Sequence, residues 1–170
     1  MKVENRTIFP IFLEDLIGKR VWEVEYGKYV KSVRVFVPPL DDWRVVIRPL
    51  RGKKPYRGFC SPKEKRILIA LNPKNNYPLT VETPVGTEPV DASLYRYTFE
   101  SVTFNSPNEL ARFIFLHEFS HLLDYLRGYS LRVKQTRANR FALKHLRGDK
   151  PRRNMSLNFA QTVPSSISCQ

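Results

Sequence analysis

Cysteine and long apolar runs are both scarce in this chain. Only two of the 170 residues are cysteines, Cys60 and Cys169, and they are far apart in the sequence with no CxxC spacing. This excludes a disulfide framework and a thiolate zinc site, and we expect a reducing, cytoplasmic location. No apolar run approaches the roughly 20 residues of a membrane span, and Pro10 interrupts the short apolar stretch at residues 8–13. We therefore expect no signal peptide and no membrane partner.

Acidic residues are also few, with 16 Asp and Glu against 29 Lys and Arg, which gives a net charge of +13. Residues 127–153 contain ten Lys or Arg and a single acid, Asp149. A basic segment of this kind predicts non-specific binding to the phosphates of nucleic acid. Two alternatives stand beside that prediction: a basic face that only confers solubility, and a cleft that selects acidic peptides. No groove-reading motif is present.

Histidine occurs only three times, yet two of the three lie four residues apart in the segment His117-Glu118-Phe119-Ser120-His121. On a helix, residues i and i+4 share one face, so both imidazoles can bind one cation while Glu118 acts on a water as general base. A helix is expected here, with Ser106 as its N-cap and Gly128 after its last residue. The alternative is a chance pattern in an amphipathic helix, with both histidines in the core.

This helix, followed by residues 134–142, resembles the core of the zincin metallopeptidases and in particular the ImmA/IrrE-like peptidases. In those families a later helix carries a Glu-x-x-Ala-Asn/Asp-x-Phe-Ala type motif, whose glutamate is the third zinc ligand. Gln135 stands at the position of that glutamate. The matching residues are Ala138, Asn139, Phe141 and Ala142. The resemblance covers residues 65–146 and implies a Zn²⁺ cofactor bound by His117 and His121.

The third ligand is left open by the sequence, because no glutamate follows Glu118. Gln135 holds the position that the resemblance indicates, whereas His145 offers the better zinc chemistry but lies about 280° around the same helix. Asp124 shares the face of His117, but one straight helix spreads His117, His121 and Asp124 over about 10 Å. Asp149 would reach the metal only if the chain folded back.

The resemblance implies a zinc-dependent peptidase that acts on a protein or peptide substrate, including proteins bound to nucleic acid. Zinc would lower the pKa of a water, and Glu118 would take its proton as the water attacks a peptide carbonyl. Tyr125 or Tyr129 could stabilise the oxyanion, or both could be ordinary core or rim aromatics. The alternative function is a catalytically degenerate zincin-like module that binds nucleic acid or protein.

Length and pattern predict one α+β domain at residues 1–148 and a polar, flexible tail at residues 149–170. We expect a compact zincin-like fold, in which a small, mostly antiparallel sheet packs on the HExxH helix and on a following basic helix. Strands are predicted at residues 20–26, 30–37, 43–47, 65–71 and 94–99, and a short helix at residues 12–17. Gly27 could form the turn between the first two strands.

Two of the segments before the HExxH helix have a predicted relation to the active site. By analogy with zincins, the strand at 65–71 would be the sheet edge that pairs with the substrate backbone, and the alternative is a buried central strand. Residues 72–91 are rich in Pro, Asn, Thr and Gly. They are expected to form an irregular loop, which either overhangs the cleft or lies on the surface.

Overall fold

The computed structural model describes residues 1–25, 32–91, 94–129 and 135–148. The expected turn at Gly27 and the expected tail at residues 149–170 lie outside this part of the chain. Within it the elements are β1 (Lys2–Asn5), α1 (Glu14–Gly18), β2 (Val21–Val24), β3 (Val33–Phe36), β4 (Arg44–Pro49), β5 (Tyr56–Ser61), β6 (Arg66–Leu71), β7 (Leu79–Pro89), β8 (Tyr95–Phe104), α2 (Pro107–Leu126) and α3 (Gln135–Arg147). The α+β class is confirmed.

Helix α2 begins and ends where the sequence predicts. The Ser106 hydroxyl accepts a hydrogen bond from the Glu109 N–H at 3.2 Å, and the Glu109 carboxylate accepts one from the Asn105 N–H at 2.7 Å. The first bond satisfies an N–H group that the first turn of a helix leaves free, and the second ties the residue before the N-cap to that turn. Gly128, with φ of 76°, takes the left-handed conformation just past the C-terminal end. Among the described residues, no helix combines the length and apolarity needed to cross a membrane.

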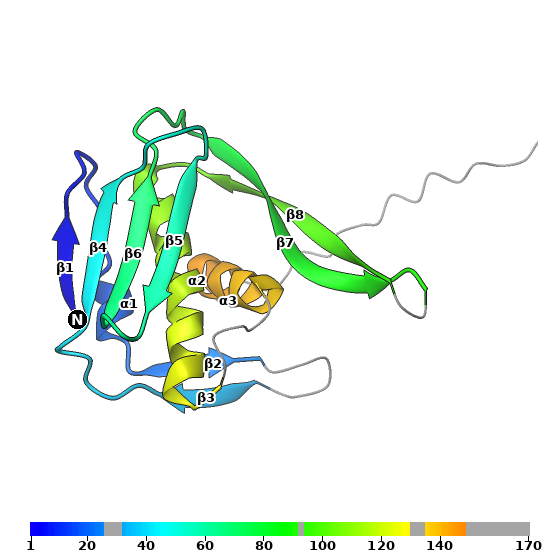
Figure 1. Cartoon of the computed structure of the whole chain (residues 1–170), viewed down its shortest axis with the longest axis horizontal. Helices are drawn as coiled ribbons and strands as arrows, with labels where there is room; N and C mark the ends of the chain where they lie inside the picture. The colour runs from blue at the N-terminus through cyan, green and yellow to red at the C-terminus, as the bar shows by residue number, and fades with distance from the viewer. Residues whose placement is uncertain (26–31, 92–93, 130–134, 149–170) are drawn as a thin grey trace, which may run out of the picture.

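The main sheet has four strands in the order β1-β4-β6-β5 (Figure 1). It is mixed, because β1 and β6 both run parallel to β4 and only β5 is antiparallel to its neighbour. The expectation of a mostly antiparallel sheet against the helix was therefore wrong for this sheet. The expectation that strand 65–71 forms the edge was also wrong, since β6 lies between β4 and β5. Its side chains are apolar on both faces, which is typical of an interior strand, and the edge strand beside it is β5.

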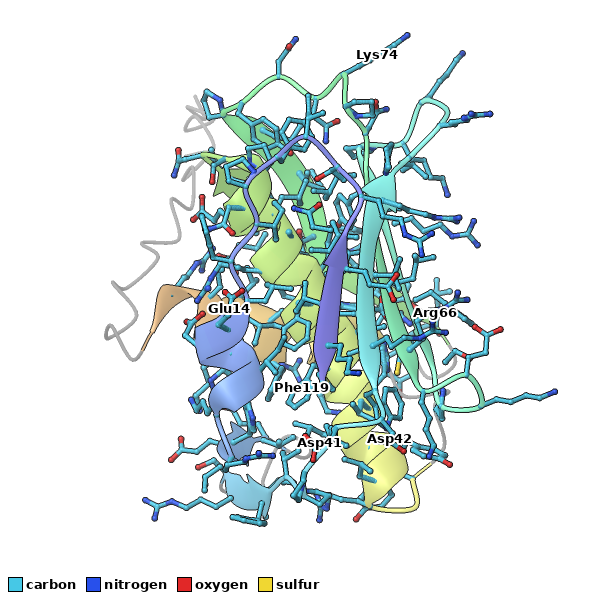
Figure 2. The ribbon with its side chains drawn as sticks, turned by 90° about the vertical axis from the view of Figure 1, so that its left-hand side faces the viewer. Glu14, Asp41, Asp42, Arg66, Lys74 and Phe119 are labelled. Atoms are coloured by element: carbon cyan, nitrogen blue, oxygen red, sulfur yellow. The ribbon has the colours of Figure 1, made fainter. Side chains whose placement is uncertain are left out.

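Side chains from the inner side of this sheet and from α2 form a single apolar cluster. Ile47, Ile67 and Ile69 from the sheet are fully buried. Helix α2 packs against β5 and β6, and its Phe119, labelled in Figure 2, is buried. The rings of Trp22 and Phe119 lie 5.1 Å apart, which ties the separate β2–β3 ribbon to the same core. This packing fixes α2, and with it the HExxH motif, against the β5 edge.

A long antiparallel ribbon of β7 and β8 projects beyond the helices (Figure 1). The expected irregular loop at 72–91 was therefore wrong over most of its length. Its prolines concealed the strand: Pro84 lies at a register shift between Pro84 and Gly86, and Pro89 lies at the end of β7. Proline is tolerated at both places, at bulges and along strands with a free edge. The bulge contacts α3, as described below.

Candidate metal centre

His117 of α2 and Gln135 of α3 meet where the two helices pack side by side. The Nε2 atom of His117 lies 2.8 Å from the Oε1 atom of Gln135. Gln135 is the first residue of α3, so the start of that helix brings its side chain to the HExxH face of α2. The structure thus places together the first histidine of the motif and Gln135, the residue that the sequence resemblance sets at the position of a ligand glutamate.

Asn139, one turn further along α3, sets the tautomer of His117. Its Nδ2 atom donates to the carbonyl of Pro84 in the β7 bulge at 2.8 Å, so its Oδ1 atom faces the His117 ring. Oδ1 can only accept, and the His117 Nδ1–H therefore donates to it at 2.6 Å. A ring nitrogen held in this way leaves Nε2 with a lone pair, which is the arrangement of a metal-binding histidine.

The short contact between His117 and Gln135 then joins two acceptors. Either the amide is turned so that its NH₂ group donates to Nε2, or a cation lies between the two atoms. A protonated ring is disfavoured, because burial, followed by the proximity of His121, lowers the pKa of His117 to about 4. In tetrahedral zinc sites with bonds of about 2.0–2.1 Å the ligand atoms are about 3.3 Å apart. A separation of 2.8 Å would have to widen by about half an ångström to admit the ion.

His121 completes the cluster. Its ring centroid lies 5.1 Å from that of His117, and it is also hydrogen-bonded to Gln135, so one amide touches both imidazoles. Burial lowers the pKa of His121, the positive charge of Arg137 lowers it further, and the bond to Gln135 raises it. Its buried Nδ1 atom has no hydrogen-bond partner among the described residues. Both rings are thus kept neutral, the form in which histidine binds metals.

Glu118 lies on the side of α2 that faces the β5 edge. Its carboxylate accepts a hydrogen bond from the Cys60 N–H, and burial raises its pKa to about 7 while that bond lowers it. Gly58 makes this approach possible. A Cβ at position 58 would lie 2.8 Å from Ile114 Cγ2 and even closer to Glu118 Oε1. A buried carboxyl with a pKa near neutrality is suited to accept and return a proton.

Gly58 and Asn139 are the residues that sequence reasoning did not assign to the site. A glycine inside a strand often marks the close approach of another group, which was an available signal for Gly58. Asn139 was noted only as a match to the family motif. It shares a helical face with the apolar Ala142 and Leu143, and a polar residue on such a face was the signal for a specific hydrogen-bonding role.

The other candidate ligands lie elsewhere or serve other contacts. His145 packs its ring on Trp22 and Phe141, at 5.0 and 4.4 Å between centroids, and its Nε2 atom lies 3.0 Å from the Glu23 carbonyl. Asp124 is buried and forms an ion pair with Arg137. Asp149 is outside the described residues. Within the described ranges, no three His, Cys, Asp or Glu side chains cluster in a way that could hold a metal ion.

The convergent donors are therefore two imidazoles and one amide oxygen. Imidazole is a good zinc ligand, whereas a neutral amide oxygen is a weaker one than the carboxylate usual at that place. The set fits a zinc ion that is held less tightly than by two histidines and a glutamate. Tyr125 and Tyr129 are each about half exposed near the C-terminal end of α2, and their oxyanion role stays a prediction.

The basic residues of α3 mostly make contacts within the protein. Arg137 pairs with Asp124, Arg140 donates to the Val85 carbonyl, and Lys144 lies 3.2 Å from Glu25. Arg147 pairs with Glu100 at 2.6 Å. The remaining cations of the 127–153 segment, apart from Arg127, lie outside the described residues. The expected nucleic-acid surface on this segment thus draws little on α3 itself.

Comparison with known proteins adds no relative: no protein-family model matches the chain, and neither a curated protein nor a solved structure matches it.

Proposed function

We propose that the protein is a zinc-dependent peptidase of the HExxH type, with His117, His121 and Gln135 as metal ligands and Glu118 as general base. The observation that carries the proposal is the bridging position of Gln135, whose side-chain amide contacts both imidazoles. Zinc bound there would supply Lewis-acid activation of a peptide carbonyl and of a water.

The residues around the ligands support this assignment. Asn139 holds the His117 ring so that its Nε2 atom faces Gln135. The Cys60 N–H holds the Glu118 carboxylate at the β5 edge of the sheet. With a pKa of about 7, Glu118 can take a proton from water and pass it to the leaving amine at neutral pH. The free edge of β5 would pair with an extended peptide, and we assign to β5 the role that the sequence suggested for residues 65–71.

A second function is favoured by one observation, the amide at position 135. A neutral ligand binds zinc less tightly than a carboxylate, so the same arrangement suits a zincin-like module that has lost turnover. In that case the chain would bind protein or nucleic acid without cleaving it. The two functions predict different effects of Glu118→Gln and Gln135→Glu.

Zinc affinity, measured by calorimetry and by metal mass spectrometry on the purified chain, tests the ligand set. We expect His121→Ala to abolish zinc binding and Gln135→Glu to strengthen it. Asn139→Ala should weaken binding by about 10- to 100-fold, since outer hydrogen bonds commonly contribute that much. His145→Ala is the matched control and should retain wild-type affinity. Weaker binding by Gln135→Glu, or loss of zinc in His145→Ala, would contradict the assignment.

Peptidase activity is tested on a fluorescent unfolded protein substrate with zinc added. We expect wild-type cleavage, and we expect Glu118→Gln to lose it while the measured zinc affinity stays unchanged. Equal rates in the two proteins would exclude the peptidase function. Zinc binding with no cleavage by either protein, or by Gln135→Glu, would favour the non-catalytic module.

A further inference from the structure

The solvent-facing side of the four-stranded sheet is rich in basic side chains, and none of them belongs to the candidate metal centre. No described helix packs on this side, and Arg66 projects from it, away from the helices (Figure 2). Residues 44–74 contain ten Lys or Arg and one acid, Glu64. This stretch is as basic as the 127–153 segment, and it contains β4, β5 and β6. We call this side the outer sheet face; it consists of Lys2, Glu4, Arg44, Val46, Arg48, Arg57, Phe59, Ser61, Arg66, Leu68 and Ala70.

Strand register arranges these side chains in three rows. In the first row, Lys2 and Arg44 lie beside Arg66 and Ser61, and in the third row Arg48 and Arg57 flank Ala70. Arg48 and Arg57 are two strands apart, which places their backbones about 10 Å apart. Each row is about 7 Å from the next along the strands. The sheet thus holds guanidinium groups at fixed spacings.

The middle row is apolar. Val46, Leu68 and Phe59 lie side by side across β4, β6 and β5, with Glu4 at the far end on β1. Phe59 is 51% exposed, whereas Val46 and Ala70 are buried although no described helix packs on this side. Arginine lays its methylene groups on apolar surface and keeps its charge in water, so the neighbouring arginines can cover these two side chains. The face therefore presents one open aromatic ring between two basic rows.

Most of these cations have no acidic partner. Among the described residues, Arg48 and Arg57 have no ion pair, and neither do Arg51, Lys53 and Lys54 in the loop that joins β4 to β5. Arg44 is 3.8 Å from Glu4, and Arg66 pairs with Glu64. This differs from α3, whose cations are largely used within the fold. An anionic partner would therefore find the outer sheet face available.

We propose that the outer sheet face binds single-stranded nucleic acid. Arginine forks match phosphate oxygens in pairs, and a flat sheet with an exposed aromatic ring offers a stacking surface to unpaired bases. A duplex keeps its bases stacked on one another, so Phe59 would have no base to contact. A membrane is a poorer fit, because the face has only one exposed apolar side chain to insert. The proposal is independent of the metal centre.

The test is fluorescence anisotropy with a labelled 20-nucleotide single-stranded DNA of mixed sequence, between 50 and 200 mM KCl and in EDTA. We expect Arg48→Glu/Arg57→Glu to weaken binding at least about tenfold and to reduce the slope of log affinity against log salt by about 1.4, since each lost phosphate contact removes about 0.7. Phe59→Ala should weaken binding by about 5- to 100-fold. The same change should leave the affinity for the matched duplex unaltered.

The control is Lys150→Glu/Arg152→Glu, which changes the net charge equally within the 127–153 segment. It should retain wild-type affinity. If it loses as much affinity as the sheet variant, or if Arg48→Glu/Arg57→Glu binds as the wild type does, the proposal is overturned. The proposal is also overturned if the duplex binds more tightly than the single strand. It is overturned as well if phosphatidylserine vesicles bind the protein more strongly than DNA does and Phe59→Ala does not change that binding. If the charge-reversal variant does not fold, Arg48→Gln/Arg57→Gln replaces it. This variant should also lose affinity for the single-stranded DNA, by a smaller factor.

Discussion

Replacing Glu118 by glutamine should stabilise the metal-free protein at high pH and leave it nearly unchanged at low pH. Burial raises the pKa of Glu118 from 4.5 to about 7. A carboxyl whose pKa is raised on folding contributes stability below its unfolded pKa and loses that contribution as the pH rises through its folded pKa. The window is therefore pH 4.5 to about 7. Glutamine keeps the shape of the side chain and does not titrate.

The size of the effect follows from that shift. A pKa rise from 4.5 to about 7 corresponds, at about 1.36 kcal/mol per unit, to about 3 kcal/mol once Glu118 is ionised in both states. The advantage of the glutamine variant should be under about 1 kcal/mol at pH 5 and about 3 kcal/mol at pH 8. His117 acts in the opposite direction, because its pKa is lowered to about 4 and its contribution is lost as the pH falls from 6.5. That contribution is common to both proteins and cancels in the comparison.

The assay is urea unfolding in EDTA at pH 5 and at pH 8, for wild type and variant. Glu14→Gln is the control, since Glu14 is exposed at the start of α1 (Figure 2). Its effect should stay within about 0.5 kcal/mol at both pH values. If the advantage of Glu118→Gln does not grow between pH 5 and pH 8, Glu118 is not desolvated at the β5 edge and the reasoning about its proton affinity fails.

Two further changes test the packing around the centre. Gly58→Ala would place a Cβ against Glu118 and Ile114 and should lower the free energy of unfolding by about 1–3 kcal/mol. The control is Gly18→Ala, which should not lower it, because nothing lies within 4 Å of a Cβ at position 18. Equal effects of the two changes in urea unfolding would contradict the close approach of Glu118 to Gly58. Arg137→Met would leave the buried Asp124 charge without its ion-pair partner and should cost about 3–5 kcal/mol. Adding Asp124→Asn should recover most of that loss in thermal unfolding, and no recovery would mean that the pair is not the source of the cost.

The sequence predicted helix α2 well because its signals are local. The N-cap at Ser106, the stop at Gly128 and the spacing of His117 and His121 all act within one element. The choice between Gln135 and His145 as the third metal ligand could not be made from local signals. Helical periodicity shows that the two residues point about 280° apart, but it does not show which of them faces α2. That depends on how α3 crosses α2, a tertiary property that no short segment encodes.

Strands β5 and β7 were missed because their sequences contain residues that normally interrupt strands. In β5 the interruption is Gly58, where a Cβ would collide with Glu118. In β7 it is Pro84, which lies at a bulge and offers its carbonyl to Asn139. The departures from strand-like composition thus coincide with contacts to the candidate centre. The rows on the outer sheet face depend on the register of separate strands, and the sequence does not give that register.

Strand β5 belongs to both surfaces discussed above. Its successive residues alternate between them: Arg57 and Phe59 point to the outer sheet face, whereas Gly58 and the Cys60 backbone touch Glu118. A ligand that moves this strand from outside therefore changes the space and the hydrogen bond available to the carboxylate inside. Linkage then requires reciprocity, so whatever occupies the inner side would change affinity on the outer side by the same factor. Any coupling between the two proposed sites would thus run through a single edge strand, one layer thick.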